Sequence, residues 1–256
     1  MPKSLRETMD HSLDLGDASA VEPGPWHYGA DYITVYFEGE RSKLRSLVPH
    51  SFEVNDITCM AYVCEIVSVA EGRADLVSSA PERTVYNEAA IGVKCSFAGK
   101  PGIYFPVMWV TTEWSLLRGL LNGYPKRLAD AVHMTKLHPL NPGLKKLGVG
   151  TVLSGYCVKG PEQELRVSVS LERQGAASDL ISFGATYGMR NFPSTDTSQS
   201  SVREAVEIMK SNSTNSDVWL GRGSLETSLD VGEPRPLSGA VYRSGFTILG
   251  SRVLKP

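Results

Sequence analysis

Lys126 and Arg127 stand side by side in a segment, residues 123–129, whose other members are small or apolar. A lysine with an ordinary pKa of about 10.4 is a poor nucleophile at neutral pH, because almost all of it is protonated. Burial and a neighbouring cation both disfavour the ammonium form, so both lower the pKa of a lysine. The neutral amine attacks a carbonyl carbon and forms a Schiff base. Pro125 and Tyr124 have restricted backbones, which helps to hold the lysine in place. The segment therefore predicts either a nucleophilic lysine or an exposed Lys-Arg pair at the start of a helix.

Glu88 is the second candidate for chemistry, because it lies in a run of alternating residues, 85–97, that is typical of a β-strand. Alternate residues of a strand point to opposite faces, so Glu88 and Tyr86 share one face and Ile91 lies on the other. If the face of Glu88 lines an interior, the carboxylate is buried and can transfer protons. If that face meets solvent, Glu88 is an ordinary exposed acid.

The elements that must position these residues are mainly short strands, because 24 glycines and 15 prolines divide the chain into short pieces. We expect strands at residues 31–37, 59–69, 85–97, 103–111, 151–159, 165–171, 180–189, 224–229 and 241–249. We expect helices at residues 41–47, 113–121 and 201–210, and loops at residues 194–201 and 211–216. The last helix depends on a capping box formed by Ser201 and Glu204. Many strands with few helices predict one β-rich α+β domain, a barrel or a sandwich.

The composition of the chain excludes several classes of protein. Its 256 residues are 41% hydrophobic and 21% charged, which is typical of a folded globular domain. The net charge of -2 argues against a nucleic-acid partner. The sequence has no apolar run of the roughly 18 residues that a membrane helix needs, and no apolar stretch of a signal peptide. Its four cysteines do not have the spacing of a zinc site. We therefore expect a cytoplasmic protein with reduced, buried cysteines, no membrane partner and no metal.

The order of several short motifs resembles the acetoacetate decarboxylase family. Residues 86–88, Tyr-Asn-Glu, are similar to the family's Tyr-x-Glu, and residues 123–128, Gly-Tyr-Pro-Lys-Arg-Leu, are similar to its Tyr-Pro-Lys-Lys-Leu segment. Each motif alone is a weak signal, but the two together are fairly specific. Weaker matches lie at residues 31–36, 44–49, 99–104, 219–225 and 234–237. The resemblance covers roughly residues 22–250.

This resemblance implies a fold and a set of site residues. The fold would be a β-rich α+β domain, an antiparallel β-barrel with an enclosed cavity and a few short helices, over residues 22–256 after an N-terminal extension at 1–21. Lys126 would be the Schiff-base lysine, and Glu88 would be the acid near the imine. Arg127 would replace the family's second lysine as a cation that cannot lose its charge. The implied assembly is a homo-oligomer, and the chemistry needs no cofactor. Tyr86 and Tyr124 would contact the substrate.

Two departures from the family pattern bear on the substrate. Ala30 occupies the position at which the decarboxylases carry an arginine that can face the substrate carboxylate. The family's Gly-Arg-Glu before the lysine segment is replaced by residues 118–120, Arg-Gly-Leu, so its acid is missing. Arg118 is the nearest substitute as a carboxylate partner in substrate binding, although its helix could turn it outward. Ala30 would enlarge the pocket.

We therefore predict a lysine-dependent Schiff-base lyase that acts on a small-molecule oxo acid or related carbonyl compound other than acetoacetate. A protonated imine is an electron sink for loss of CO2, of a proton or of water. The same lysine would thus serve a decarboxylase, or an aldolase-dehydratase or dehydratase, and the sequence leaves these open. A further alternative is a non-catalytic barrel that binds a small molecule.

Overall fold

The structure is a computed structural model that describes residues 21–196 and 198–255. All but Val21 of the expected N-terminal extension lies outside the described residues. The eleven strands are β1 (Trp26–Glu38), β2 (Thr58–Ala70), β3 (Val85–Phe97), β4 (Lys100–Val110), β5 (Lys126–Leu128), β6 (Ala131–Met134), β7 (Val152–Lys159), β8 (Glu162–Gln174), β9 (Ala185–Phe192), β10 (Val202–Thr227) and β11 (Arg235–Val253). The α-helices are α2 (Arg41–Leu47), α3 (Leu76–Ser79) and α4 (Glu113–Asn122), with single 3-10 turns at Pro81–Arg83 and Ala177–Asp179.

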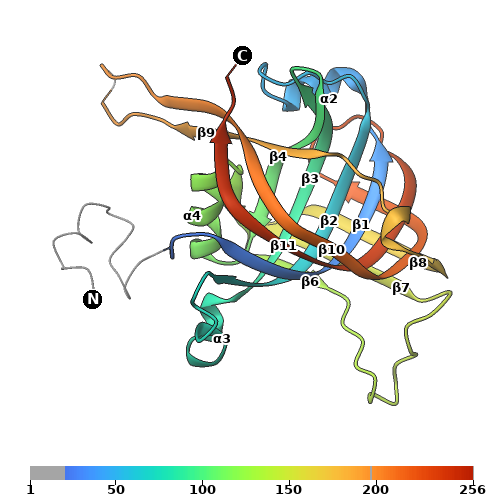
Figure 1. Ribbon diagram of the computed structural model, residues 1–256. Helices are drawn as coiled ribbons and strands as arrows, with labels where there is room; N and C mark the ends of the chain where they lie inside the picture. The colour runs from blue at the N-terminus through green and yellow to red at the C-terminus, as the bar shows by residue number, and fades with distance from the viewer. Residues whose placement is uncertain (1–20, 197, 256) are drawn as a thin grey trace.

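Seven of these strands close into a hydrogen-bonded ring. The pairing order is β11-β1-β2-β3-β4-β9-β10, and β10 pairs again with β11. The pairings are antiparallel apart from β4 with β9 and β4 with β5. Figure 1 shows β10 and β11 curving across the front of β1 to β4, so that the long strands enclose the space behind them. The ring confirms the prediction of a β-rich, barrel-like fold with a few short helices.

Two apolar cores form on opposite sides of the first strands. The outer faces of β1, β2 and β3 pack against β6, β7 and β8, with Ile33, Val63 and Ile91 completely buried there. The inner faces line the ring, where Tyr62 and Ala90 belong to a second buried cluster. The alternation of a strand thus sends neighbouring residues into different cores.

Most of the predicted elements are confirmed, but two stretches differ: residues 202–216 form a strand instead of a helix and a loop, and residues 180–184, predicted as the start of a strand, precede β9 without strand structure. The helix predicted at residues 41–47 and the strand at 85–97 match α2 and β3. Residues 201–210, predicted as a helix, and residues 211–216, predicted as a loop, belong instead to the long strand β10. The apolar spacing of residues 201–210 also fits a strand, in which Val206 and Ile208 alternate inward. Hydrogen bonds to β9 and β11 on both sides stabilise the extended form. Strands β5 and β6 were not predicted.

None of the described helices is long and apolar enough to cross a membrane. The longest of them, α4, has 10 residues. All four cysteines are buried and free, as expected for small core residues.

Candidate active site

A cavity of about 260 Å³ lies inside the ring. Its walls come from β1, β2, β3, β4, β10, β11 and α4, and β5 closes one side. Seven of its lining residues are tyrosines: Tyr28, Tyr32, Tyr36, Tyr62, Tyr86, Tyr124 and Tyr242. A wall of aromatic and aliphatic side chains with several polar groups is typical of a small-molecule site.

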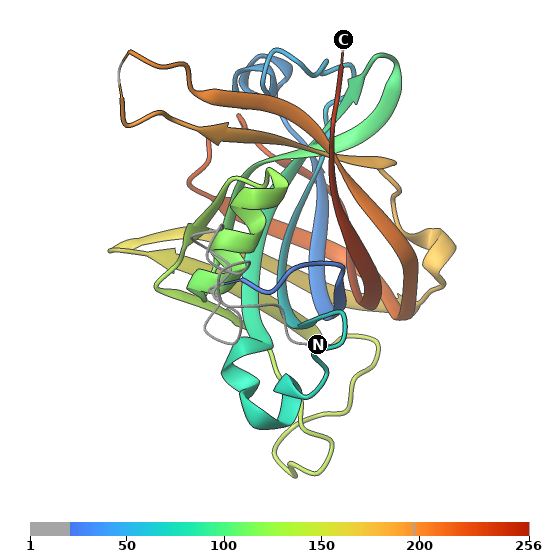
Figure 2. The ribbon, with the colours of Figure 1, turned by 60° about the vertical axis from the view of Figure 1, so that its left-hand side comes forward.

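The end of helix α4 places Lys126 in this wall. Gly123 ends the helix with φ +96, a left-handed conformation that glycine adopts without strain. The Tyr124 N–H then donates to the carbonyl of Gly119 at 2.9 Å, which turns the chain back along the helix. Lys126 begins the short strand β5, which pairs in parallel with β4 opposite Met108. Figure 2 shows α4 lying to one side of β3 and β4.

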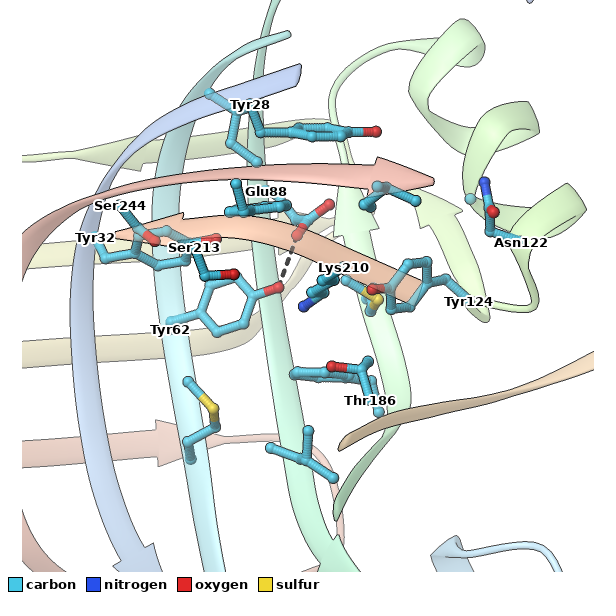
Figure 3. A pocket seen from close by; sticks show the side chains of 18 of the residues that line it. Tyr28, Tyr32, Tyr62, Glu88, Asn122, Tyr124, Thr186, Lys210, Ser213 and Ser244 are labelled. Atoms are coloured by element: carbon cyan, nitrogen blue, oxygen red, sulfur yellow. Dashed lines mark hydrogen bonds between the residues drawn. The ribbon is translucent and has the colours of Figure 1, made fainter. Parts of the chain in front are cut away.

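Lys126 and Glu88 form a buried ion pair in the cavity. Lys126 Nζ lies 2.7 Å from Glu88 Oε2, and the two side chains are 7% and 5% exposed. Lys126 Nζ also donates a hydrogen bond to Ser115 Oγ at 3.1 Å. Glu88 Oε1 accepts a hydrogen bond from the Tyr62 hydroxyl at 2.7 Å, drawn as a dashed line in Figure 3. Glu88 Oε2 makes no well-aligned hydrogen bond, so this oxygen is free to take a proton. Strand alternation predicted that Glu88 faces inward if the strand lines an interior, and it does.

The tyrosines around the pair are neutral hydrogen-bonding groups. Burial raises the pKa of Tyr62, Tyr86 and Tyr124 well above the usual value, and the nearby Glu88 carboxylate raises each of them further. The ring centroids of Tyr86 and Tyr124 lie 5.1 and 6.0 Å from Lys126 Nζ, so both contact the amine end of the lysine. The structure thus brings the predicted substrate-contacting tyrosines to the lysine.

Arg118 is buried in the cavity wall and already has an acidic partner. It is 3% exposed, and its guanidinium donates to Ser68 Oγ at 2.7 Å and to Glu22 Oε2 at 3.4 Å. The guanidinium also stacks on Trp26 and Trp114, 5.4 and 4.9 Å from the ring centroids. Arg118 therefore points inward, and only its Nε lacks a hydrogen-bond partner.

Neither Arg127 nor Ala30 is among the residues that line the cavity. Arg127 follows Lys126 on β5 and is exposed, because neighbouring residues of a strand point to opposite sides. This corrects the expectation that Arg127 is the cation beside the lysine. Ala30 is buried in the inner cluster of β1, between the ladder partners Ser244 and Ile66, which both line the cavity.

Lys210 on β10 is a cavity cation that the sequence did not reveal. Figure 3 shows its side chain reaching into the cavity, and its Nζ lies 5.2 Å from the ring centroid of Phe246. The residue is exposed to solvent, although its side chain lies among the walls of the cavity. Desolvation by these walls lowers the pKa of Lys210 to about 8, although Glu88 acts in the opposite direction. In the sequence, Lys210 is a single lysine at the end of residues 201–210, a segment whose pattern predicts a helix.

Comparisons with known proteins place the chain in a family. The sequence matches the profile of the family "acetoacetate decarboxylase (ADC)" over residues 15–255. No curated protein sequence matches it significantly. A solved structure of an acetoacetate decarboxylase-like enzyme from Sphingomonas wittichii RW1 is 35% identical, with a TM-score of 0.87 over 94% of this chain and 97% of that chain.

Two more distant structures share the fold. The enduracididine biosynthesis enzyme MppR complexed with pyruvate is 22% identical, with a TM-score of 0.83 and coverage of 94% of each chain. An acetoacetate decarboxylase from Legionella pneumophila is 15% identical, with a TM-score of 0.72 over 91% of this chain and 88% of that chain. At these identities the likeness extends to the fold alone.

Proposed function

Because the chain belongs to the acetoacetate decarboxylase family, we propose that it is a Schiff-base lyase in which Lys126 attacks the carbonyl carbon of an oxo acid or related compound. The observation that carries this proposal is the contact of 2.7 Å between Lys126 Nζ and Glu88 Oε2 inside a cavity. A buried amine beside a buried carboxylate has both a nucleophile and a proton acceptor for its activation.

The first steps form the imine. Lys126 transfers a proton from Nζ to Glu88 Oε2, and the neutral amine adds to the carbonyl carbon. The carbonyl oxygen takes one proton from the attacking nitrogen and one back from Glu88 and leaves as water, so that a protonated C=N bond replaces the C=O bond and Glu88 is again a carboxylate. Tyr62 donates to the other carboxylate oxygen at 2.7 Å and so holds Glu88 in place through both halves of this transfer.

The protonated imine then accepts an electron pair from a neighbouring bond. In decarboxylation the C–C bond to the carboxylate breaks, CO2 leaves, and the electron pair forms an enamine. Glu88 passes a proton from water to the enamine carbon, and water then hydrolyses the imine to release the ketone and Lys126. The neutral tyrosines around the lysine supply hydrogen bonds without adding an anion that would compete for the iminium charge.

Condensation with loss of water is a second candidate, and Ala30 favours it. The alanine gives β1 no cation to hold a leaving carboxylate beside the imine. In this reaction the iminium loses a proton from its neighbouring carbon, and the enamine formed bonds to the carbon of an aldehyde. Water is then eliminated, and hydrolysis frees the lysine. The same amine and carboxylate serve both reactions.

Reductive trapping tests the shared first step. The protein is incubated with a panel of oxo acids, ketones and aldehydes and then reduced with borohydride. We expect a mass increase equal to the carbonyl compound less one oxygen atom, mapped by peptide analysis to Lys126. Lys126→Ala should abolish the adduct, whereas Lys145→Ala, which changes an exposed lysine, should not. An adduct that persists in Lys126→Ala contradicts the proposal.

A further inference from the structure

The charges that line the cavity are unbalanced. Three cations reach it, Arg118, Lys126 and Lys210, but only one acid, Glu88, does so among the described residues. Glu88 pairs with Lys126, and Glu22 approaches Arg118 from outside the cavity. None of the described acids forms an ion pair with Lys210. One positive charge in the cavity is therefore left without a fixed counterion.

The position of Lys210 is built into the strand. Val206 and Ile208 precede it at alternate positions, and both are buried inside the ring. The next inward position carries Lys210, which is exposed to solvent and lines the cavity with a charged side chain. The pairing register of β10 with β11 shifts between Met209 and Lys210. The extra residue of this bulge is Leu249 of β11, so the alternation of β10 continues through Lys210.

We propose that Lys210 binds the carboxylate of the substrate, so that the cavity accepts oxo acids as monoanions. The carbonyl carbon then bonds to Lys126 while the carboxylate supplies the missing counterion at Lys210. This inference rests on the proposed Schiff-base function, because it assigns a binding residue to the carboxylate end of the same substrate.

The groups around Lys210 suit a carboxylate better than a neutral ligand. Tyr124 lines the same cavity, and its raised pKa keeps its hydroxyl protonated as a donor, while the Tyr62 hydroxyl already donates to Glu88. An ammonium paired with a carboxylate makes a hydrogen bond about twice as strong as a neutral one. With its pKa at about 8, Lys210 is mostly charged at neutral pH. Arg118 is less suited, because Ser68 and Glu22 already occupy its guanidinium.

Matched pairs of an acid and its amide measure how much the contact between Lys210 and the carboxylate contributes to binding. Pyruvate is compared with pyruvamide, and acetoacetate with acetoacetamide, because each amide keeps the shape and loses the charge. The readout is the concentration that gives half-maximal borohydride trapping at Lys126. We expect at least one acid to be trapped at about 10- to 100-fold lower concentration than its amide, the range for a hydrogen bond to a charged group. Lys210→Met should remove this preference, so that an acid and its amide are trapped at similar concentrations.

Two further variants control for effects on folding. Lys210→Arg keeps the charge and should retain most of the preference, and Lys145→Met changes an exposed lysine and should retain all of it. Thermal unfolding of each variant checks that it folds. A preference for the acid that survives in Lys210→Met overturns the proposal, as does equal trapping of acids and amides by the unaltered protein.

Binding of lactate tests the role of Lys210 independently of the proposed function. It carries a carboxylate but no carbonyl, so its binding does not require an imine. Titration calorimetry should show lactate binding about tenfold or more weaker in Lys210→Met than in the unaltered protein, within the same range. Unchanged lactate affinity overturns the role of Lys210 even if Lys126 forms adducts. Loss of lactate binding without any adduct at Lys126 supports Lys210 and contradicts only the Schiff-base function.

Discussion

The aliphatic stem of Lys126 occupies the space that a side chain at position 119 would need. A Cβ atom built on Gly119 would lie 2.3 Å from Lys126 Cδ and 2.8 Å from Cε. Atoms at such distances overlap, so the lysine can extend along α4 only because this helix position has no side chain. The helix backbone thus forms the back of the slot that directs the amine toward Glu88.

Gly119→Ala should therefore impair chemistry without impairing folding. Alanine is favoured over glycine inside a helix by roughly 0.5–1 kcal/mol, and the flexible lysine can move aside at low cost. The displaced amine no longer meets Glu88, and we expect borohydride trapping to slow by about 10- to 100-fold. Gly29→Ala is a suitable control, because a Cβ at Gly29 meets no atom within 4 Å. Trapping at the normal rate in Gly119→Ala would contradict this positioning role.

Glu88→Gln should separate imine formation from turnover. The amide cannot take up or return the proton, so we expect turnover to fall by roughly two to four powers of ten. Trapping at Lys126 should be slower but should still occur, because the nucleophile is retained while its proton acceptor is lost. Glu65→Gln, which alters a carboxylate paired with Lys136 outside the cavity, should leave both quantities unchanged. Equal loss of trapping and turnover in Glu88→Gln would argue for a purely structural carboxylate.

Tyr62→Phe should destabilise the fold through Glu88. Removing the hydroxyl leaves a buried carboxylate oxygen without its donor at 2.7 Å, at a cost of about 1–3 kcal/mol in the free energy of unfolding. The measurement is urea unfolding of the two single variants, Tyr62→Phe and Glu88→Gln, and of the double variant. Because the residues are in contact, their effects should not be additive. Tyr156→Phe, in a partly exposed tyrosine of β7, is the control.

The preference for an acid over its amide should decline as the pH rises through about 8. The pKa of Lys210 is lowered, so its side chain is charged below about pH 8 and neutral above it. The tyrosines that face it do not titrate there, because their pKa values are raised. The measurement is the ratio of acid to amide trapping, with pyruvate and pyruvamide, from about pH 6.5 to about pH 9.5, a range that spans this pKa. The ratio cancels the pH dependence of the imine chemistry, because both compounds share it. A ratio that stays constant would show that another group binds the carboxylate.

Acetoacetate should be a poor substrate for decarboxylation. Ala30 provides no arginine to hold the carboxylate beside the iminium, and the smaller side chain leaves room for a bulkier compound. We expect kcat/KM for CO2 release below about 10⁴ M⁻¹s⁻¹, the lower end of ordinary enzymes. The assay compares CO2 release from acetoacetate with condensation and water loss from pyruvate and an aldehyde. Efficient CO2 release would show that β1 needs no arginine.

Local patterns were sufficient to predict the elements that carry Lys126 and Glu88. The alternation of residues 85–97 predicted β3 and the shared face of Tyr86 and Glu88, because one strand has only two faces. The Gly-Tyr-Pro sequence before Lys126 indicated a break after a helix, and Gly123 ends α4. In both cases the deciding contacts lie within a few residues along the chain.

Lys210 could not be predicted in this way, because its place depends on distant strands. Residues 202–216 contain serine, asparagine and threonine, which alone are typical of loops. They form a strand because β9 and β11 pair with both of its edges. The outward direction of Arg127 has a similar origin, since β5 exists only through its pairing with β4. Tertiary pairing thus overrides local preference.

Alternate residues of β3 face two different cores, so they differ in how well they tolerate substitution. Ala89 and Ile91 are packed against the outer layer, so replacing them costs stability whatever the substrate. Tyr86 and Glu88 border an open cavity, where a change of side chain alters the shape and charge offered to a ligand. Evolution can therefore vary the inward residues of the strand other than Glu88 to acquire new substrates while the intervening residues preserve the fold. Libraries for altering specificity should randomise inward positions and keep Glu88.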